Sequence, residues 1–357
     1  SGTTDSETIE INVRAPVTTI VGNESELEAA IAAAGPGDMI LLQNGTWADL
    51  VIHLTGEGTE THPITLGAET PGSVILTGES RVEIGGSWLV LQDLSFEGFY
   101  AGNDDEVIQF RRGGGNLAHN CRVTNISMVN YYPENGEKTV WVSFYGTNNR
   151  LDNSYFKGHN VIGVTVVVWL DGNPNYHRID HNHFSDRMSG GGENGWETIR
   201  IGTSDNSMSD SRTTVDYNLF TRVNGEIEII SNKSGKNVYR FNTFEECEGT
   251  LTLRHGNECI VDSNTFLGGN LARTGAVRVI GEDHLIINNY IHGTTARDGA
   301  AITVYAGVPN SPLNEYFAAH GATIAFNTFV NNLGPLIEIA AGYGERDRTV
   351  LPLSLIH

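Results

Sequence analysis

Residues 180–184 read Asp-His-Asn-His-Phe, and the pattern Asp-x-Asn-x-Phe returns along the chain with small variations. Its other copies are Asp152-x-Ser154-x-Phe156, Asp216-x-Asn218-x-Phe220, Arg240-x-Asn242-x-Phe244, Asp262-x-Asn264-x-Phe266, Asn289-x-Ile291 and Asn327-x-Phe329. Successive copies are separated by 28, 36, 24, 22, 25 and 38 residues. A unit of about 22–25 residues with loop insertions predicts a solenoid, with Asn stacked in an internal ladder and Phe filling the lumen.

Short apolar segments with period-two alternation accompany this repeat and argue against helices. They are rich in Ile, Val, Leu and Thr and are bounded by Gly and Asn, which is typical of strands. The fold class that we predict is all-β, a right-handed parallel β-helix. Four strands follow Gly195, Gly225, Gly249 and Gly275. Their expected inward positions are Ile199/Ile201, Ile227/Ile229, Leu251/Leu253 and Val277/Val279.

One helix is expected, over about residues 23–35. Ser25-x-x-Glu28 forms a candidate capping box, Leu27 and Ile31 begin an apolar face, and Gly35-Pro36-Gly37 is a stop signal. Such a helix would cover the exposed first coil of the solenoid. No linker interrupts the rest, so we expect a single domain over residues 1–357.

The composition excludes several classes of protein. With 22 Lys and Arg against 43 Asp and Glu, the net charge of −21 argues against nucleic acid as a partner. No run of 18 apolar residues predicts a membrane span, and the first residues lack the regions of a signal peptide. We expect Cys121, Cys247 and Cys259 to be small buried side chains, with a Cys247–Cys259 bridge as the alternative.

Charge is unevenly distributed. Residues 187–278 hold ten Lys and Arg against twelve Asp and Glu, a net charge of −2. A near-neutral region on an acidic body can attract an anion, especially beside a bound cation.

The same region contains a group of oxygen ligands. Glu226-Ile227-Glu228 places two carboxylates on one strand face, and Asn194 lies at the edge of the preceding coil's strand. Carboxylate and amide oxygens suit Ca²⁺, with water completing its coordination. The alternative is a solvated glutamate pair beside Arg200 and Arg254.

Two basic side chains lie next to these ligands. Lys233 follows Glu228 by five residues, and Arg254 lies one coil on, directly before His255. A lysine beside an arginine and a cation is disfavoured in its charged form, so it can act as a general base. The alternatives are a surface lysine and an Arg254–Glu228 ion pair.

The core of this region resembles polysaccharide lyase family 6, which holds alginate lyases and the dermatan-sulfate lyase chondroitinase B. The similar runs are Asn194–Gly202, Gly225–Ser234 and Leu253–Gly256, with further similarity at residues 37–47 and 309–317. The resemblance implies that Asn194, Glu226 and Glu228 hold Ca²⁺, that Lys233 is the general base, and that Arg254 is the general acid. It implies substrate contacts at Arg200, His255, Arg278 and Tyr316.

The resemblance further implies a secreted or periplasmic enzyme whose catalytic coils lie at about residues 190–280. It would cleave a uronate polymer by Ca²⁺-assisted β-elimination and release unsaturated oligosaccharides. Alginate is the expected substrate because an acidic body suits an unsulfated polymer. Dermatan sulfate is the alternative, with Arg212, Arg222 or Arg273 available for sulfate. Many alginate-degrading members carry a second β-helix domain that this sequence does not contain, and we favour a monomer.

Three other functions remain open at this stage. A hydrolase of the polygalacturonase kind would need an aspartate cluster, which this strand face lacks. Elimination of the pectate-lyase kind usually has an arginine as its base, where this chain offers Lys233. A non-catalytic carbohydrate-binding solenoid would bind without turnover, because a fold alone does not determine function.

Overall fold

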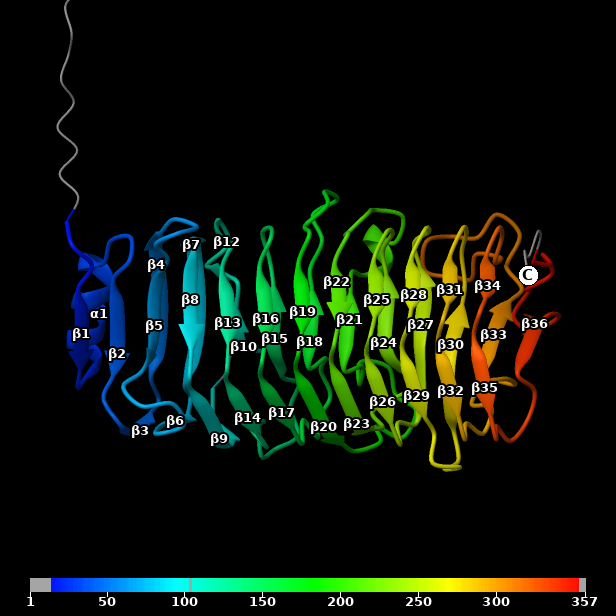
Figure 1. Cartoon of the computed structure of the whole chain (residues 1–357), viewed down its shortest axis with the longest axis horizontal. Coiled ribbons are helices and arrows are strands. Elements are labelled where there is room, and N and C mark those ends of the chain that lie inside the picture. Colours follow the sequence, from blue (N-terminus) through cyan, green and yellow to red (C-terminus); the bar gives the residue numbers. More distant parts are fainter. Residues whose placement is uncertain (1–13, 103–104, 353–357) are drawn as a thin grey trace, which may run out of the picture.

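The chain winds into successive coils, and most coils add one strand to each of three sheets (Figure 1). This computed structural model describes residues 14–102 and 105–352. The strands follow one another along the long axis from the blue end to the red end of the chain. Neighbouring strands within the three sheets pair in parallel, apart from one antiparallel hairpin of β11 and β12. The predicted all-β parallel β-helix is therefore confirmed.

The strands of the three sheets alternate along the chain. The first contains β1 (Thr18–Val21), β2 (Met39–Leu42), β5 (Ile64–Ala68), β8 (Leu89–Gln92), β13 (Arg122–Thr124), β16 (Arg150–Asp152), β19 (Arg178–Asp180), β22 (Thr214–Asp216), β25 (Val238–Arg240), β28 (Ile260–Asp262), β31 (Leu285–Ile287) and β34 (Thr323–Ala325). The second contains β3 (Gly45–Ala48), β6 (Val74–Gly78), β9 (Ser95–Tyr100), β14 (Ser127–Val129), β17 (Tyr155–Lys157), β20 (His183–Arg187), β23 (Leu219–Val223), β26 (Thr243–Glu245), β29 (Thr265–Leu267), β32 (Tyr290–His292) and β35 (Thr328–Val330). The third contains β4 (Val51–Glu57), β7 (Arg81–Ser87), β10 (Glu106–Gln109), β11 (Arg111–Arg112), β12 (Asn116–His119), β15 (Val140–Phe144), β18 (Val166–Val168), β21 (Ile199–Ile201), β24 (Glu228–Lys233), β27 (Gly249–His255), β30 (Thr274–Val279), β33 (Ile302–Tyr305) and β36 (Ile337–Ala341).

The first coil is covered by α1 (Glu24–Ala33), which buries Leu27 and Ile31. The expected capping box at Ser25 is wrong by two residues, because Asn23 is the N-cap. Its side chain accepts a hydrogen bond from the Glu26 amide, and Glu26 in turn accepts one from the Gly22 amide. The sequence contains two overlapping cap patterns, and the extended backbone of Asn23 selects the first.

The repeated Asn and Phe positions form the two internal stacks that the sequence predicts. From Asn182 to Asn289, each side-chain oxygen accepts hydrogen bonds from the backbone of the preceding copy, at 2.9–3.1 Å. The five phenylalanines from Phe156 to Phe266 stack with ring centroids 4.6–5.1 Å apart. Each of these asparagines thus has a hydrogen-bond partner on the preceding coil, which fixes the alignment of the coils.

Strand β24 departs from the expected alternation. Its register pairs Ile230 with Ile199 and with Leu251, and it pairs Asn232 with Ile201. A shift between Glu228 and Ile230 interrupts the ladder, as a β-bulge does. The register expected for Ile227/Ile229 is therefore wrong: Ile230 and Asn232 take these positions and are buried, while Ile229, at the bulge, is also buried in the core.

Two smaller expectations concern the cysteines and membrane association. Cys121, Cys247 and Cys259 are free and buried, as predicted, so the alternative disulfide is not formed. Within residues 14–102 and 105–352, no helix has the length and hydropathy needed to cross a membrane.

Candidate active site

Four neighbouring strands of the third sheet bring most of the predicted site residues together. The register pairs Arg200 with Ser231, Ser231 with Thr252, and Thr252 with Arg278, in strands β21, β24, β27 and β30. It pairs Lys233 with His255 at the end of the same strands. Residues that lie up to 84 positions apart in the sequence (Asn194 to Arg278) are thereby assembled on coils spaced about 4.8 Å apart.

Three carboxylates crowd the start of this region. The Glu226 side chain accepts hydrogen bonds from the amides of Gly195 (3.2 Å) and Trp196 (3.3 Å), directly after Asn194. Burial and then the charges of Glu197 and Glu228 raise the pKa of Glu226 to about 8. A carboxylate with such a pKa favours either a proton or a nearby cation.

Glu197 was not predicted as a site residue. Its side chain is 1% exposed, and neither carboxylate oxygen has a hydrogen-bond partner among the described residues. Its Oε1 atom lies 3.9 Å from Nζ of Lys233. The signal that could have identified it is its position two residues before the inward Ile199, where the alternation predicts an apolar side chain.

Glu228 is paired with one cation and one hydroxyl group. Its Oε1 atom lies 3.3 Å from Nη1 of Arg278, and its other oxygen accepts a hydrogen bond from the Ser231 hydroxyl. Arg278 is 5% exposed, and its Nε atom lies 2.9 Å from Asp298. The expected substrate contact at Arg278 is thus occupied by two carboxylates, which anchor it beside the site.

Arg254 is held by a loop 60 residues further along the chain. It donates hydrogen bonds to the carbonyls of Glu315 (2.8 Å) and Asn314 (3.1 Å), and it lies over the ring of Tyr316 at 4.1 Å. Burial lowers the pKa of Arg254 from its ordinary value. The alternative considered for Arg254, an ion pair with Glu228, is not formed among the described residues; Arg278 pairs with Glu228 instead.

His255 lies between the two basic side chains. Its Nε2 atom is 3.0 Å from Nη1 of Arg254, and its strand position pairs with Lys233. Burial and then the charge of Arg254 lower the pKa of His255 to about 3, so the imidazole is neutral at neutral pH. A neutral His255 can accept the Arg254 hydrogen bond and fix its orientation.

The remaining predicted residues border this cluster. The Arg200 guanidinium lies 5.2 Å from the centre of the Trp169 ring. The Tyr316 ring stacks on Tyr305 at 5.7 Å, and its hydroxyl accepts a hydrogen bond from Arg278 at 3.3 Å. Asn194 is exposed in the loop before β21. The amides of Gly195 and Trp196 in this loop donate hydrogen bonds to Glu226.

The chemistry of these donors fits a hard cation. No group of three or more His, Cys, Asp or Glu side chains in the described part of the chain is arranged to hold a metal ion. Asn194, Glu226 and Glu228 are instead a mixed set of one amide and two carboxylates. The pKa of Glu226 is raised by burial and by Glu197 and Glu228, and neither oxygen of Glu197 has a hydrogen-bond partner among the described residues, so carboxylate oxygens are crowded there. Oxygen donors with excess negative charge are the surroundings that Ca²⁺ prefers.

Comparison with known proteins shows the same fold and the same family. The family model for Chondroitinase B matches residues 21–357. The alginate lyase AlyGC, of family PL6, is 44% identical and superposes with a TM-score of 0.90 over 95% of this chain. A mannuronic acid specific family 6 lyase from the human gut microbiota is 34% identical over 96% of this chain, with a TM-score of 0.85.

A third solved structure, a PL6 polysaccharide lyase from Pseudopedobacter saltans, is 29% identical over 94% of this chain, with a TM-score of 0.82. This chain spans 47% of the AlyGC chain and 82% of each of the other two. None of the curated proteins matches it significantly. The family match over nearly the whole sequence, together with the 44% identity to AlyGC, shows that the chain belongs to the chondroitinase B family, polysaccharide lyase family 6.

Proposed function

We propose that this protein cleaves alginate by β-elimination and releases oligosaccharides with a C4–C5 double bond. The observation that carries the proposal is the meeting of Lys233, the Arg254–His255 pair and the Glu226/Glu228 carboxylates on neighbouring strands. A chain 44% identical to an alginate lyase supports alginate over other uronate polymers.

Proton removal is the role that we assign to Lys233. The side chain is 14% exposed, so the base is shielded from most of the bulk water while its end remains near the site surface. The amine takes the proton from C5 of the uronate, and a positioned base of this kind contributes about 10²–10⁴-fold to the rate. Glu197, at 3.9 Å, positions the amine from the inner side.

Departure of the O4 oxygen is the step that we assign to Arg254. The carbonyls of residues 314 and 315 and the ring of Tyr316 fix the guanidinium before substrate arrives. Such a preorganised donor stabilises the negative charge that develops on the leaving oxygen. Because arginine gives up a proton reluctantly, Arg254 stabilises the negative charge on O4 and a water molecule supplies the proton.

We also propose that Ca²⁺ is held by Asn194, Glu226 and Glu228. A bound Ca²⁺ would neutralise the substrate carboxylate and stabilise the charge that builds up there. Arg200 adds a cationic group on the neighbouring strand, where it can contact the same carboxylate.

An acidic polysaccharide is the partner that this site fits, and a polymer of this kind is degraded outside the cytoplasm. We therefore propose a secreted or periplasmic location. Dermatan sulfate is a second candidate substrate, because the matching family model is that of chondroitinase B.

The deciding experiment is incubation of the protein with polymannuronate, polyguluronate, pectin and dermatan sulfate, followed by ultraviolet absorbance of the unsaturated product. We expect absorbance to rise with the alginate blocks. A rise with dermatan sulfate alone would show that dermatan sulfate, and not alginate, is the substrate. New reducing ends without absorbance would indicate a hydrolase, and binding without turnover would indicate a carbohydrate-binding solenoid.

A further inference from the structure

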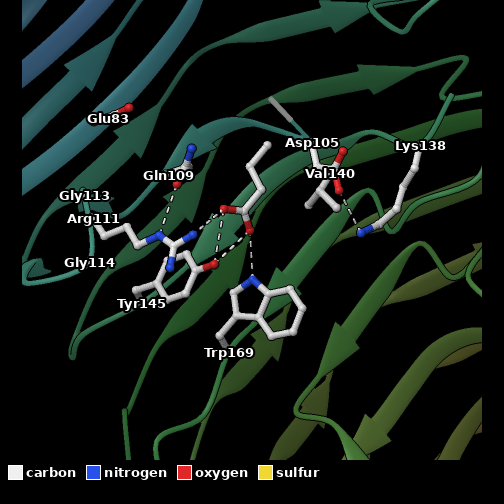
Figure 2. Close-up of a pocket in the computed structure, with 11 residues that line it drawn as sticks. Glu83, Asp105, Gln109, Arg111, Gly113, Gly114, Lys138, Val140, Tyr145 and Trp169 are labelled. Carbon is white, nitrogen blue, oxygen red and sulfur yellow. Dashed lines mark hydrogen bonds and ion pairs between the residues drawn. The ribbon is translucent and has the colours of Figure 1, made fainter. Parts of the chain in front are cut away.

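A cavity lies on the third sheet, outside the cluster around Lys233 (Figure 2). Its volume is about 740 Å³, and its lining residues come from the coils of β7, β10, β15 and β18. Ligand pockets in proteins commonly range from about 300 to 1,000 Å³. The cavity is therefore large enough for part of a sugar chain.

The strand register places this cavity in line with the general base. Phe144 pairs with Val168, Val168 with Ile201, and Ile201 with Asn232. The residues that follow these partners occupy one column across the coils, which runs Arg111, Tyr145, Trp169, Gly202 and Lys233. Four coil spacings separate Arg111 from Lys233, about 19 Å at the strand spacing of a sheet.

The side chains of this column contact one another from coil to coil. The Arg111 guanidinium lies over the Tyr145 ring at 3.9 Å, and the Tyr145 and Trp169 rings stack at 6.3 Å with 17° between their planes. At its other end this column approaches the candidate active site, because the Arg200 guanidinium lies 5.2 Å from the centre of the Trp169 ring. The cavity wall and the predicted active site are thus one continuous surface of rings and cations.

A single carboxylate fixes this wall. Glu106 accepts hydrogen bonds from Nη2 of Arg111 (3.0 Å), the Tyr145 hydroxyl (2.9 Å) and Nε1 of Trp169 (3.0 Å). Since Glu106 is 9% exposed and paired with Arg111, its own charge is largely compensated. The rings and the guanidinium are therefore held in place before any ligand binds.

The charges of the lining leave donors for an acidic sugar. Nε and Nη2 of Arg111 bind Gln109 and Glu106, whereas Nη1 has no partner among the described residues. Lys138 lies on the opposite side of the cavity, 3.2 Å from the exposed Asp105. Glu83, the remaining acid of the lining, lies 3.4 Å from His53. Arginine binds carboxylates well, and aromatic rings pack against the apolar faces of sugar rings.

We propose that this cavity is a distal subsite for the polysaccharide, in which Tyr145 and Trp169 contact a pyranose ring and Arg111 binds a uronate carboxylate. The proposal rests on the proposed function and deepens it. A span of four coils exceeds the length of a disaccharide, so only long chains engage Lys233 and the cavity together. The subsite accordingly favours polymer over short oligosaccharides.

Adjacent arginines on β11 provide a matched test. Arg111 lines the cavity, whereas Arg112 is exposed and does not line it. We expect Arg111→Ala to lower kcat/KM on polymeric alginate about 10-fold, the loss of one charged hydrogen bond, mainly through KM. Turnover of a trisaccharide should be unchanged, and Arg112→Ala should change neither substrate. Circular dichroism and the melting temperature verify that both variants fold.

A second variant occludes the cavity without removing a contact. Gly114 lines the cavity, and a Cβ atom added there meets no atom within 4 Å. We expect Gly114→Trp to reduce turnover of polymer and to spare the trisaccharide. Unchanged polymer kinetics in both variants would overturn the subsite, as would an equal loss on both substrates. Absence of turnover by the wild-type protein would instead reject the proposed function.

Discussion

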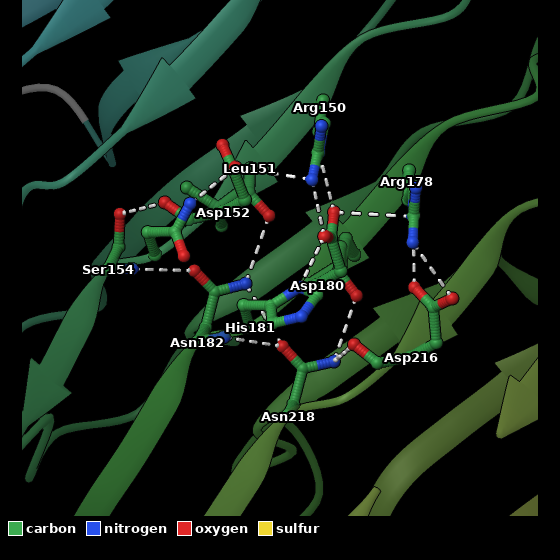
Figure 3. A network of polar contacts seen from close by, with 12 residues as sticks. Arg150, Leu151, Asp152, Ser154, Arg178, Asp180, His181, Asn182, Asp216 and Asn218 are labelled. Carbon is green, nitrogen blue, oxygen red and sulfur yellow. Dashed lines mark hydrogen bonds and ion pairs between the residues drawn. The ribbon is translucent and has the colours of Figure 1, made fainter. Parts of the chain in front are cut away.

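The corner between the first and second sheets and the candidate active site use the same coil stacking with opposite electrostatic results. At the corner, Arg150 binds Asp180 through two hydrogen bonds of 2.7 and 2.6 Å, and Arg178 binds Asp216 at 3.0 and 3.1 Å (Figure 3). Each aspartate is buried and is paired with an arginine of the preceding coil. At the active site, Glu197, Glu226 and Glu228 bring like charges together instead.

The difference separates stabilising charges from functional ones. A charge that recurs on successive coils and lies beside an opposite charge is neutralised by it. Such pairs stabilise the solenoid. Like charges that lie close together raise the free energy of the cation-free site. The pKa of Glu226, which burial and its two acidic neighbours raise, indicates this cost. Such a cost is typical of functional sites, where a cation or substrate offsets it.

The largest expected effect is loss of turnover on substitution of the general base. Lys233→Ala should lower kcat about 10²–10⁴-fold, because proton transfer then falls to water. Its matched control is Lys236→Ala, since Lys236 lies three residues on and pairs with Asp210 at 2.8 Å on the surface. Product absorbance measures the rate, and thermal melting verifies folding. Near wild-type turnover by Lys233→Ala would remove the lysine from the mechanism.

The second effect concerns the cation. Calcium added to chelator-treated protein should raise its melting temperature, with a stabilisation of about 2.7 kcal/mol at a hundredfold excess over Kd. Glu226→Gln removes one of the proposed calcium ligands, so it should abolish this shift. Above about pH 8, where Glu226 is charged, it should also stabilise the calcium-free protein. Glu258→Gln, at an exposed partner of Lys236, is the control and should retain the shift. A wild-type protein that melts identically with and without calcium would contradict the proposed ligand set.

The asparagine ladder and the phenylalanine stack could be predicted from the sequence because they repeat. The Asn and Phe positions recur on successive coils, so one copy predicts the contacts of the next. The N-cap was misplaced because Asn23-x-x-Glu26 and Ser25-x-x-Glu28 overlap, and local pattern alone does not choose between them.

The site was predictable only in part, because it lies where the repeat is broken. The bulge in β24 moves Asn232 into the interior, where its side chain bonds Ser234 and His255. Period-two alternation carries no sign of such an insertion. The contact between Arg254 and the carbonyl of Glu315 spans 61 residues and involves a backbone group, which no residue type reveals.

The third effect tests the internal ladder, which contributes to stability and is remote from turnover. Asn242→Ala removes the acceptor for both the backbone and the side-chain amide of Asn218. Leaving buried donors without a partner should lower the free energy of unfolding by about 2–4 kcal/mol. Urea denaturation measures the loss, and the folded variant should retain its turnover. Asn173→Ala, in an exposed turn, is the control; an equal loss there would indicate that the ladder carries no special share of stability.

The smallest expected effect is the acid response of the corner. Burial alone would raise the pKa of Asp180, but hydrogen bonds from Arg150 and His181 lower it below its ordinary value. A lowered pKa means that the folded state holds the charged form, so the contribution is present above the unfolded-state pKa of about 3.9 and is lost as the pH falls through the folded-state value. Since the side chains of Arg150 and Arg178 are 35% and 40% exposed, solvent screening limits the contribution to about 1 kcal/mol. Asp180→Asn should therefore flatten the loss of stability below about pH 4, whereas Asp171→Asn, in an exposed turn, should leave the acid limb as in the wild type. An acid limb unchanged by Asp180→Asn would mean that the paired corner is neutral in stability, and the contrast with the active site would then rest on the crowded glutamates alone.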